Sequence, residues 1–368
     1  MTPRILYRAI PILTASLVYF IFRLLPYESN IVETYYSQGF YKYWRIIWDA
    51  TLSQSPVPLI YLLLIVVAYY LIRSYRACQR RTKSLIDFVV QYSLDLIVLI
   101  ALFVLSFYLL WGYNYKRINV INQLLSQSDE KISERDLFAE LDEVTIRLNH
   151  LRATLPDSIA WSNLVSDDDD VYRPALKQIY TRLNLDDSGD VRVRSLYPRG
   201  SLLHWSTAGV YIPFVSEGHI DPGLHPIVWP FTILHEMSHG YGYTGEDTCN
   251  FWALLACVNS DSSIIQYSGY MSYWRYLRSN AYRTNRDQFY DSMSCVNPLV
   301  LKDLDAIYEY SNRYPDILPL IRDLIYDSYL KRHGISDGLK NYSRIIVLSM
   351  QWQKQYGSLS IKSSAEGQ

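Results

Sequence analysis

Residues 230–240 read Pro-Phe-Thr-Ile-Leu-His-Glu-Met-Ser-His-Gly, and this stretch is the most informative one for the fold. Pro230 suits the first turn of a helix and Gly240 suits the residue that ends one, so a helix is predicted between them. In such a helix, His235 and His239 are i, i+4 neighbours on one face. That spacing allows two imidazoles to bind one metal ion.

Glu236 directly follows the first histidine and would lie beside a bound ion rather than on it. From there it can accept a proton from a water molecule whose pKa zinc has lowered to about 7. We therefore expect one zinc ion, with Glu236 as the catalytic base. The motif alone can also arise by chance. The surrounding residues therefore decide whether it is a metal site or a chance match.

The residues after the motif offer a third ligand. Three glycines within residues 240–245 permit a tight reversal of the backbone, and a second helix is predicted from Glu246 to Val258. Glu246 is the expected third ligand and Asp247 is the alternative; three protein ligands leave the fourth position of a catalytic zinc open. The competing interpretation is that Glu246 and Asp247 bind no metal and occur there because acidic residues favour helix N-termini, with Thr244 as the cap.

Several other residues have candidate supporting roles. Asn250 lies one turn beyond Glu246, where it could hydrogen-bond a ligand histidine and fix its tautomer. His219 or His225 could replace the third ligand. The candidates for stabilising an oxyanion are Tyr211, His333 and Tyr342.

Three apolar runs fill the first third of the chain: Ala9–Leu25, Val57–Ile72 and Phe88–Trp111, with the third span itself near residues 90–111. Each run approaches the roughly 20 residues needed to cross a bilayer core. No small-x-small site follows the first run, so an anchor is expected rather than a cleaved signal peptide. Residues 1–111 are therefore predicted to form a membrane anchor, with the lipid bilayer as a partner.

The basic residues indicate an orientation. Arg4 and Arg8 precede the first run, and a basic cluster follows the second, made of Arg73, Arg76, Arg80, Arg81 and Lys83. Under the positive-inside rule both regions are cytoplasmic. We expect a multi-pass protein of the cytoplasmic (inner) membrane, with its N-terminus in the cytoplasm and residues 112–368 outside. Lys116 and Arg117 oppose the rule but are outnumbered.

The loop Pro26–Pro56, also expected outside, is rich in tyrosine and tryptophan. Amphipathic rings of this kind favour the membrane–water boundary. We therefore expect the loop to rest on the outer membrane surface. The residues concerned are Tyr35, Tyr36, Tyr41, Tyr43, Trp44 and Trp48.

Residues 112–368 are predicted to form one mostly helical domain with a small sheet. Short strands are predicted at Val191–Leu196 and Ala208–Val215, and Ser133 is a good N-cap for a helix through Leu151. Further helices are predicted over Ser262–Tyr282, Pro298–Arg313, Ile317–His333 and Tyr342–Tyr356. The expected fold class is mainly α: three transmembrane helices followed by a mostly helical, zincin-like α+β domain.

Composition excludes some partners. A net charge of −1 with no basic face gives no reason to expect nucleic acid. Four cysteines are too few for a disulfide framework, so buried thiols are expected, with Cys257–Cys295 as the one bridge considered. The acidic run Asp167–Asp170 lacks the ligand spacing of a calcium site and is expected to be a solvated loop.

An ordered set of stretches also resembles a known family. They are Gly209–Glu217, His235–His239, Glu246-Asp247 with Asn250-Phe251, Tyr267–Tyr270, Trp111–Arg117, Tyr329–Lys331, Gly338 and Tyr342. This set resembles a bacterial family catalogued as a domain of unknown function, whose members have three N-terminal membrane spans and a zinc-peptidase-like motif. The resemblance implies a gluzincin-like peptidase with the ligands and base named above. Thr248 and Cys249 depart from the pattern, which usually has an acid and an alanine there.

The expected function is zinc-dependent hydrolysis of peptide bonds outside the cytoplasmic membrane, with a peptide or protein as substrate. The strand Ala208–Val215 could bind an extended substrate by edge pairing. One alternative is a catalytically inactive, metal-stabilised binding or scaffold protein of the cell envelope. An intramembrane protease is disfavoured, because only the short stretch Ile227–Leu234 beside the motif is apolar. The sequence carries no signal for an oligomeric state.

Overall fold

The computed structural model describes residues 3–125, 132–157, 160–166, 168–317, 319 and 344–361. The described chain is mainly helical, with one small three-stranded sheet, which confirms the predicted fold class in its helical content and its sheet. The chain divides into two compact units. Unit 1 comprises Met1–Ile118, Ser188–Val191 and Ile212–Glu217, and unit 2 comprises Asn119–Asp187, Arg192–Tyr211 and Gly218–Gln368.

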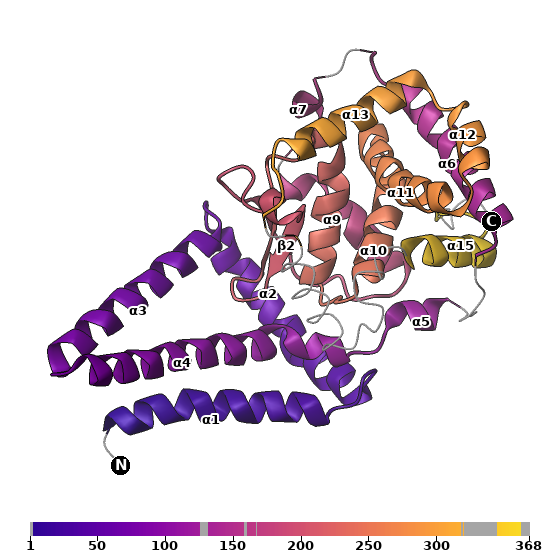
Figure 1. The fold of residues 1–368 in the computed structure, drawn as a ribbon. Coiled ribbons are helices and arrows are strands. Elements are labelled where there is room, and N and C mark those ends of the chain that lie inside the picture. Colours follow the sequence, from indigo (N-terminus) through magenta and orange to yellow (C-terminus); the bar gives the residue numbers. More distant parts are fainter. Residues whose placement is uncertain are drawn as a thin grey trace. The chain divides into compact units, whose positions relative to one another are not determined.

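Unit 1 contains three long apolar helices: α1 (Pro3–Leu24), α3 (Leu59–Arg81) and α4 (Leu85–Leu110). Each is long and apolar enough to cross a membrane, as the three apolar runs predicted. Both α1 and α3 pack along α4, and Figure 1 shows α3 and α4 joined by a tight turn.

The basic cluster between the second and third spans does not form the loop that was predicted. Helix α3 continues through Arg81, so Arg73, Arg76 and Arg80 are helical, and only residues 82–84 connect α3 to α4. Arginine has a high helix propensity, and positive charge is favourable at a helix C-terminus. These two effects extend the helix beyond the end of its apolar run.

Asp95 of α4 joins the three apolar helices. Its Oδ1 accepts a hydrogen bond from Arg8 Nε of α1 at 2.7 Å, and its Oδ2 accepts one from Ser74 Oγ of α3 at 2.5 Å. Its backbone carbonyl accepts a bond from the Tyr70 hydroxyl at 3.0 Å. A charged group among apolar helices is costly unless it is paired, and here the pairing links all three helices.

The segment between α1 and α3 contains η1 (Val32–Tyr41), α2 (Lys42–Ala50) and η2 (Leu52–Gln54), and η3 (Gly112–Lys116) follows α4. Lys116 and Arg117, the two basic residues that oppose the positive-inside rule, both interact with residues of unit 1. Lys116 Nζ lies 3.4 Å from the centre of the Tyr27 ring, and Arg117 pairs with Glu33 at 2.9 Å. Their charges are therefore compensated locally.

The sheet of unit 2 has the order β1-β3-β2, from β1 (Val193–Ser195), β2 (Gly209–Ile212) and β3 (Glu217–Ile220). β1 and β3 are parallel, with Val193 opposite Gly218. The two predicted strands are present but shorter than expected. β3 was not predicted, because only Ile220 of Glu-Gly-His-Ile is a residue type typical of strands, although every residue of β3 is buried.

The helices of unit 2 follow the predicted pattern closely. Ser133 is the N-cap of α6, and its side-chain oxygen accepts a hydrogen bond from the Asp136 N–H. Helix α10 has the predicted bounds. The N-cap of α10 is Gly245, and not Thr244 as in the competing interpretation of Glu246 and Asp247. The longer helices are α6 (Glu134–Ala153), α8 (Arg173–Arg182), α9 (Trp229–Gly240), α10 (Glu246–Val258), α11 (Ser263–Thr284), α12 (Arg286–Met293), α13 (Pro298–Asn312) and α15 (Arg344–Tyr356). The predicted helix Ile317–His333 and the start of Tyr342–Tyr356 lie outside the described residues.

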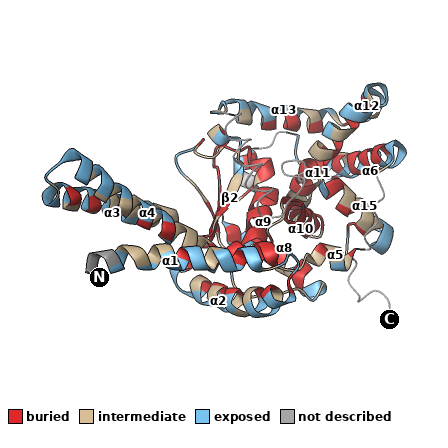
Figure 2. Ribbon diagram, turned by 60° about the horizontal axis from the view of Figure 1, so that its bottom comes forward, coloured by how far each residue is buried: buried red, intermediate tan, exposed pale blue. Residues whose placement is uncertain are grey.

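Short helical segments connect these elements. They are α5 (Val120–Leu124), α7 (Trp161–Leu164), η4 (Asp169–Val171), η5 (Leu203–Trp205) and η6 (Pro226–Val228). Helix α10 forms the centre of the core: all of its residues are buried, and it packs against α8, α9 and α11. In Figure 2, both α9 and α10 are coloured as buried.

Two predictions about exposure are corrected. Three cysteines are buried as expected, but Cys295 is exposed, and neither it nor Cys257 forms a disulfide. In the acidic run, Asp169 is buried rather than solvated, because its carboxylate pairs with Arg192 and Arg173. Asp167 lies outside the described residues.

The contact between α10 and α11 depends on Gly269. A Cβ built at this position would lie 2.3 Å from Cys257 Cβ, so any side chain would force the two helices apart. We expect Gly269→Ala to lower the free energy of unfolding by about 1–3 kcal/mol, despite the higher helix propensity of alanine. Denaturant unfolding of the detergent-solubilised protein measures this difference.

Ser279→Ala on the exposed face of the same helix is the matched control, and we expect a change within about 0.5 kcal/mol. Equal effects of the two substitutions would contradict the steric explanation.

Candidate metal centre

Helix α9 carries both histidines of the motif. Pro230 lies in its first turn and the helix ends at Gly240, as the sequence predicted. His235 and His239 are both buried, and their Nε2 atoms lie 3.2 Å apart. The helical spacing therefore brings the two imidazoles to one point on the buried face of α9.

A tight turn over residues 241–245 directs the chain back to this point. Gly242 has a φ of +87°, a conformation that favours glycine, and its N–H donates to the His239 carbonyl at 2.9 Å. Helix α10 then begins at Glu246. Its first side chain is thereby placed opposite the histidine pair.

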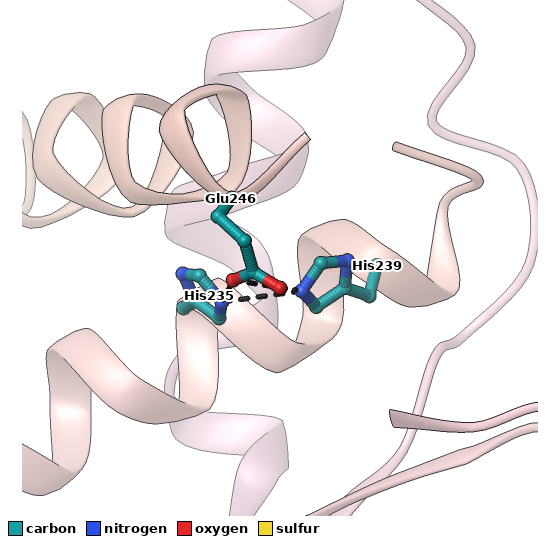
Figure 3. Close-up of side chains that lie close together, drawn as sticks. All are labelled: His235, His239 and Glu246. Atoms are coloured by element: carbon teal, nitrogen blue, oxygen red, sulfur yellow. Dashed lines mark hydrogen bonds and ion pairs between the residues drawn. The ribbon is translucent and has the colours of Figure 1, made fainter. Parts of the chain in front are cut away.

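Glu246 completes a group of three ligand-type side chains. Its Oε2 lies 3.2 Å from His235 Nε2 and 3.7 Å from His239 Nε2. One ligand atom from each of the three residues lies within 4.8 Å of the others, and all three residues are buried. Figure 3 shows the carboxylate of Glu246 pointing from its helix toward both imidazoles.

The other residues considered as ligands lie elsewhere. Asp247 Oδ1 accepts from the Thr248 N–H at 2.8 Å, and its Oδ2 lies 3.5 Å from Arg344 of α15. His219 is buried in β3, and His225 accepts from the Ile227 N–H at the start of η6. Burial lowers the pKa of each of these two histidines to about 4. None of the three belongs to the His-His-Glu group.

The orientation of His239 is set by groups that the sequence analysis did not identify. Its Nδ1 lies 2.9 Å from the Tyr243 carbonyl oxygen, which can only accept, so in the neutral imidazole the proton resides on Nδ1 and Nε2 is free to bind a metal ion. Cys249 Sγ lies 3.3 Å from the same Nδ1. Asn250, which was expected in this role, lies instead beside Tyr276 of α11. Cys249 has no partner at ligand spacing in the sequence, so the sequence gave no signal for this contact.

The charges of the group are strongly coupled. Burial alone would raise the pKa of Glu246, but His239 and His235 hold that pKa well below its usual value. Burial alone would lower the pKa of His239, whereas Cys249 and Glu246 raise it well above its usual value. Burial raises the pKa of Cys249 to about 11, so this thiol is neutral near pH 7.

Glu236 has a different environment from Glu246. It is buried beside the group, and burial raises its pKa to about 7 against the opposing effect of His235 and His239. Its Oε2 has no hydrogen-bond partner among the described residues. A carboxyl group of this kind can both accept and release a proton near neutral pH.

Two glycines of the sheet make room for Glu236. A Cβ on Gly209 of β2 would lie 2.6 Å from Glu236 Oε1, and a Cβ on Gly218 of β3 would lie 2.9 Å from Glu236 Cβ. Larger residues at either position would displace the glutamate. The sheet therefore packs directly against the residue between the two histidines.

The predicted oxyanion candidates receive no support from the geometry. Tyr211 is buried in β2, and His333 and Tyr342 lie outside the described residues. Tyr276 of α11 hydrogen-bonds with Asn250, and the charge of Glu246 adds to the rise in the pKa of Tyr276. Burial, the larger cause, raises that pKa to about 12, so the phenol keeps its proton and remains a hydrogen-bond donor.

The geometry makes a specific prediction about the third ligand. We expect Glu246→Ala to weaken zinc binding by more than about 100-fold, because loss of an outer hydrogen-bond partner alone typically costs about 10–100-fold. Asp247→Ala should retain zinc, because its carboxylate interacts with Thr248 and Arg344. Competition with a chelator of known affinity measures both variants. Loss of zinc in Asp247→Ala with retention in Glu246→Ala would reverse the assignment.

Comparison with known proteins places the chain in a family. The family model described as "Protein of unknown function (DUF3810)" matches residues 36–350, which include most of unit 1 and the whole His-His-Glu group. No curated protein and no solved structure matches the chain. The chain therefore belongs to the DUF3810 family of proteins of unknown function.

Proposed function

We propose that the protein is a membrane-anchored, zinc-dependent hydrolase that cleaves peptide bonds outside the cytoplasmic membrane. Zinc would be held by His235, His239 and Glu246, and Glu236 would be the base. The observation that carries the proposal is the position of Glu236, a buried carboxyl group with a pKa of about 7 beside the three ligand-type side chains. A site that only stabilised the fold would not need such a group.

The three side chains fit a zinc ion in chemistry and in spacing. Two imidazole nitrogens and one carboxylate oxygen form a ligand set that catalytic zinc sites use. Ligand atoms about 2.1 Å from a tetrahedral ion lie roughly 3.4 Å from one another. The separations between His235, His239 and Glu246 are 3.2, 3.2 and 3.7 Å.

The residues of the chain divide the chemistry between them. When bound, zinc supplies Lewis acidity to a carbonyl group and lowers the pKa of a water molecule. Glu236 accepts a proton from this water molecule at its carboxylate and then donates it to the leaving nitrogen. The Tyr243 carbonyl keeps His239 in the tautomer that a ligand needs.

The sheet offers a place for an extended substrate. β2 is an edge strand of the described sheet, and Gly209 at its start packs against Glu236. An extended peptide that paired with β2 would run past the proton acceptor. A peptide or protein is therefore the substrate class that we propose.

The proposed location follows from the charge distribution. The arginines in the last turns of α3 mark the cytoplasmic ends of α3 and α4. A chain crossing three times from a cytoplasmic N-terminus then has unit 2 outside the cytoplasmic membrane. The three helices would hold the enzyme close to substrates of the membrane or envelope.

Glu236→Gln tests the enzymatic proposal against a metal-stabilised scaffold. We expect turnover in a peptide-library cleavage assay to fall by about 100-fold or more, because a proton acceptor is lost, while zinc content is unchanged. His239→Ala should lose both zinc and turnover. The control for folding is the thermal unfolding of each variant. A Glu236→Gln protein that cleaves peptides as fast as the wild type would disprove the role of Glu236.

A proline in β2 tests the substrate site. We expect Val210→Pro to reduce turnover severely while zinc content stays the same, because proline removes a backbone donor and disturbs strand pairing. Zinc content measured on the same preparation shows that the metal group is intact. Unchanged turnover in this variant would rule out substrate pairing along β2.

A further inference from the structure

The segment between α1 and α3 has its charges on the inside. Residues 31–57 contain four charged side chains, and none of them is exposed. Arg45 and Asp49 of α2 are buried, and Glu33 and Lys42 are half-buried. This distribution is the reverse of that on a helix facing water.

The buried face of α2 makes polar contacts within unit 1. Arg45 and Asp49 form an i, i+4 ion pair at 2.7 Å. Arg45 also donates to the Ser216 carbonyl at 2.8 Å, and Asp49 accepts from the Asp190 N–H at 2.8 Å. These bonds determine which side of α2 faces the protein.

The two tryptophans of α2 also belong to this inner side. Trp48 Nε1 donates to the Val215 carbonyl at 3.0 Å, and Trp44 Nε1 lies 3.3 Å from Ser216 Oγ. Their polar N–H groups are thus satisfied by protein.

The exposed side chains of the same segment are uncharged and mostly apolar. Tyr35 of η1 is 75% exposed, and Tyr43 and Ile47 of α2 are 64% and 62% exposed. We call this exposed side the apolar face. Its other exposed members are Ile31, Phe40, Ile46, Leu52 and Val57.

The position of the segment in the chain identifies what covers this face. It begins seven residues after Leu24, where α1 ends, and finishes two residues before Leu59, where α3 begins. Because α1 and α3 are both candidate membrane spans, both ends of the segment lie at a bilayer surface. We propose that the apolar face binds the lipid bilayer, with α2 lying in the headgroup and upper acyl region parallel to the membrane plane.

The chemistry of the face matches this environment. Aliphatic side chains such as Ile46 and Ile47 gain by leaving water, and no exposed charge opposes their entry. The exposed tyrosines can insert their rings and keep their hydroxyls at the headgroups, as aromatic residues do at membrane interfaces. The inward ion pair of Arg45 and Asp49 then remains out of the lipid.

Spin labelling of the full-length protein tests this proposal. Single cysteines replace Ile47 and Tyr43 in a Cys295→Ser background, since Cys295 is the exposed cysteine and the other three are buried. The protein is reconstituted in vesicles of phosphatidylcholine and phosphatidylglycerol. Power-saturation EPR compares collisions with oxygen, which concentrates in lipid, and with a polar nickel chelate, which stays in water.

Ile146→Cys on α6 of unit 2 is the matched control, because Ile146 is 67% exposed and of the same residue type as Ile47. We expect the ratio of oxygen to nickel accessibility to be several-fold higher for labels at 47 and 43 than at 146. Equal, water-like ratios at the three positions would overturn the proposal. Low accessibility to both reagents at 47 and 43 would also overturn it, because a second copy or another protein would then cover the face.

Discussion

The pairing of Glu246 with His235 and His239 is the interaction on which unit 2 depends. All three groups are buried, and a buried carboxylate is tolerated only when charged or hydrogen-bonding partners compensate it. This pairing joins the first residue of α10 to the buried face of α9. Because α10 is buried along its whole length and packs on α8 and α11, its position fixes much of the core.

The two glutamates of the site have opposite protonation behaviour. Glu246 lies between two imidazoles that favour its charged form, and Glu236 is buried beside them with its carboxylate facing glycine backbone. Pairs of acids whose surroundings push their pKa values apart are typical of sites that transfer protons. One acid can then serve as a permanent ligand and the other as a proton carrier. The glycines of β2 and β3 maintain this difference because they leave Glu236 no polar side chain to bind.

Unit 1 also pairs its buried charges, but its outer surface is apolar. Six of its charged residues form ion pairs with one another, in the pairs Arg8–Asp95, Arg45–Asp49 and Arg117–Glu33. Its outer surface is rich in exposed leucine, isoleucine, valine and tyrosine. In lipid, unpaired polar groups are costly and apolar surface is not, so an inward arrangement of charge is stable. The polar contacts therefore specify how the apolar helices pack, since lipid and helix surfaces are equally apolar.

Local patterns in the sequence determined the three apolar helices, the helix that carries His235 and His239, and the bounds of α10. Helical periodicity, apolar length, and the placement of proline and glycine act over a few residues, so they are readable without a fold.

Only the tertiary structure showed that Glu246, and not Asp247, lies against His235 and His239, and that the Tyr243 carbonyl and Cys249 contact His239. It also revealed β3, whose four residues form a strand because they are buried between β1 and β2 rather than because of their own propensity. Such contacts depend on which segments distant in sequence approach one another, and the packing of α9, α10 and the sheet determines that approach.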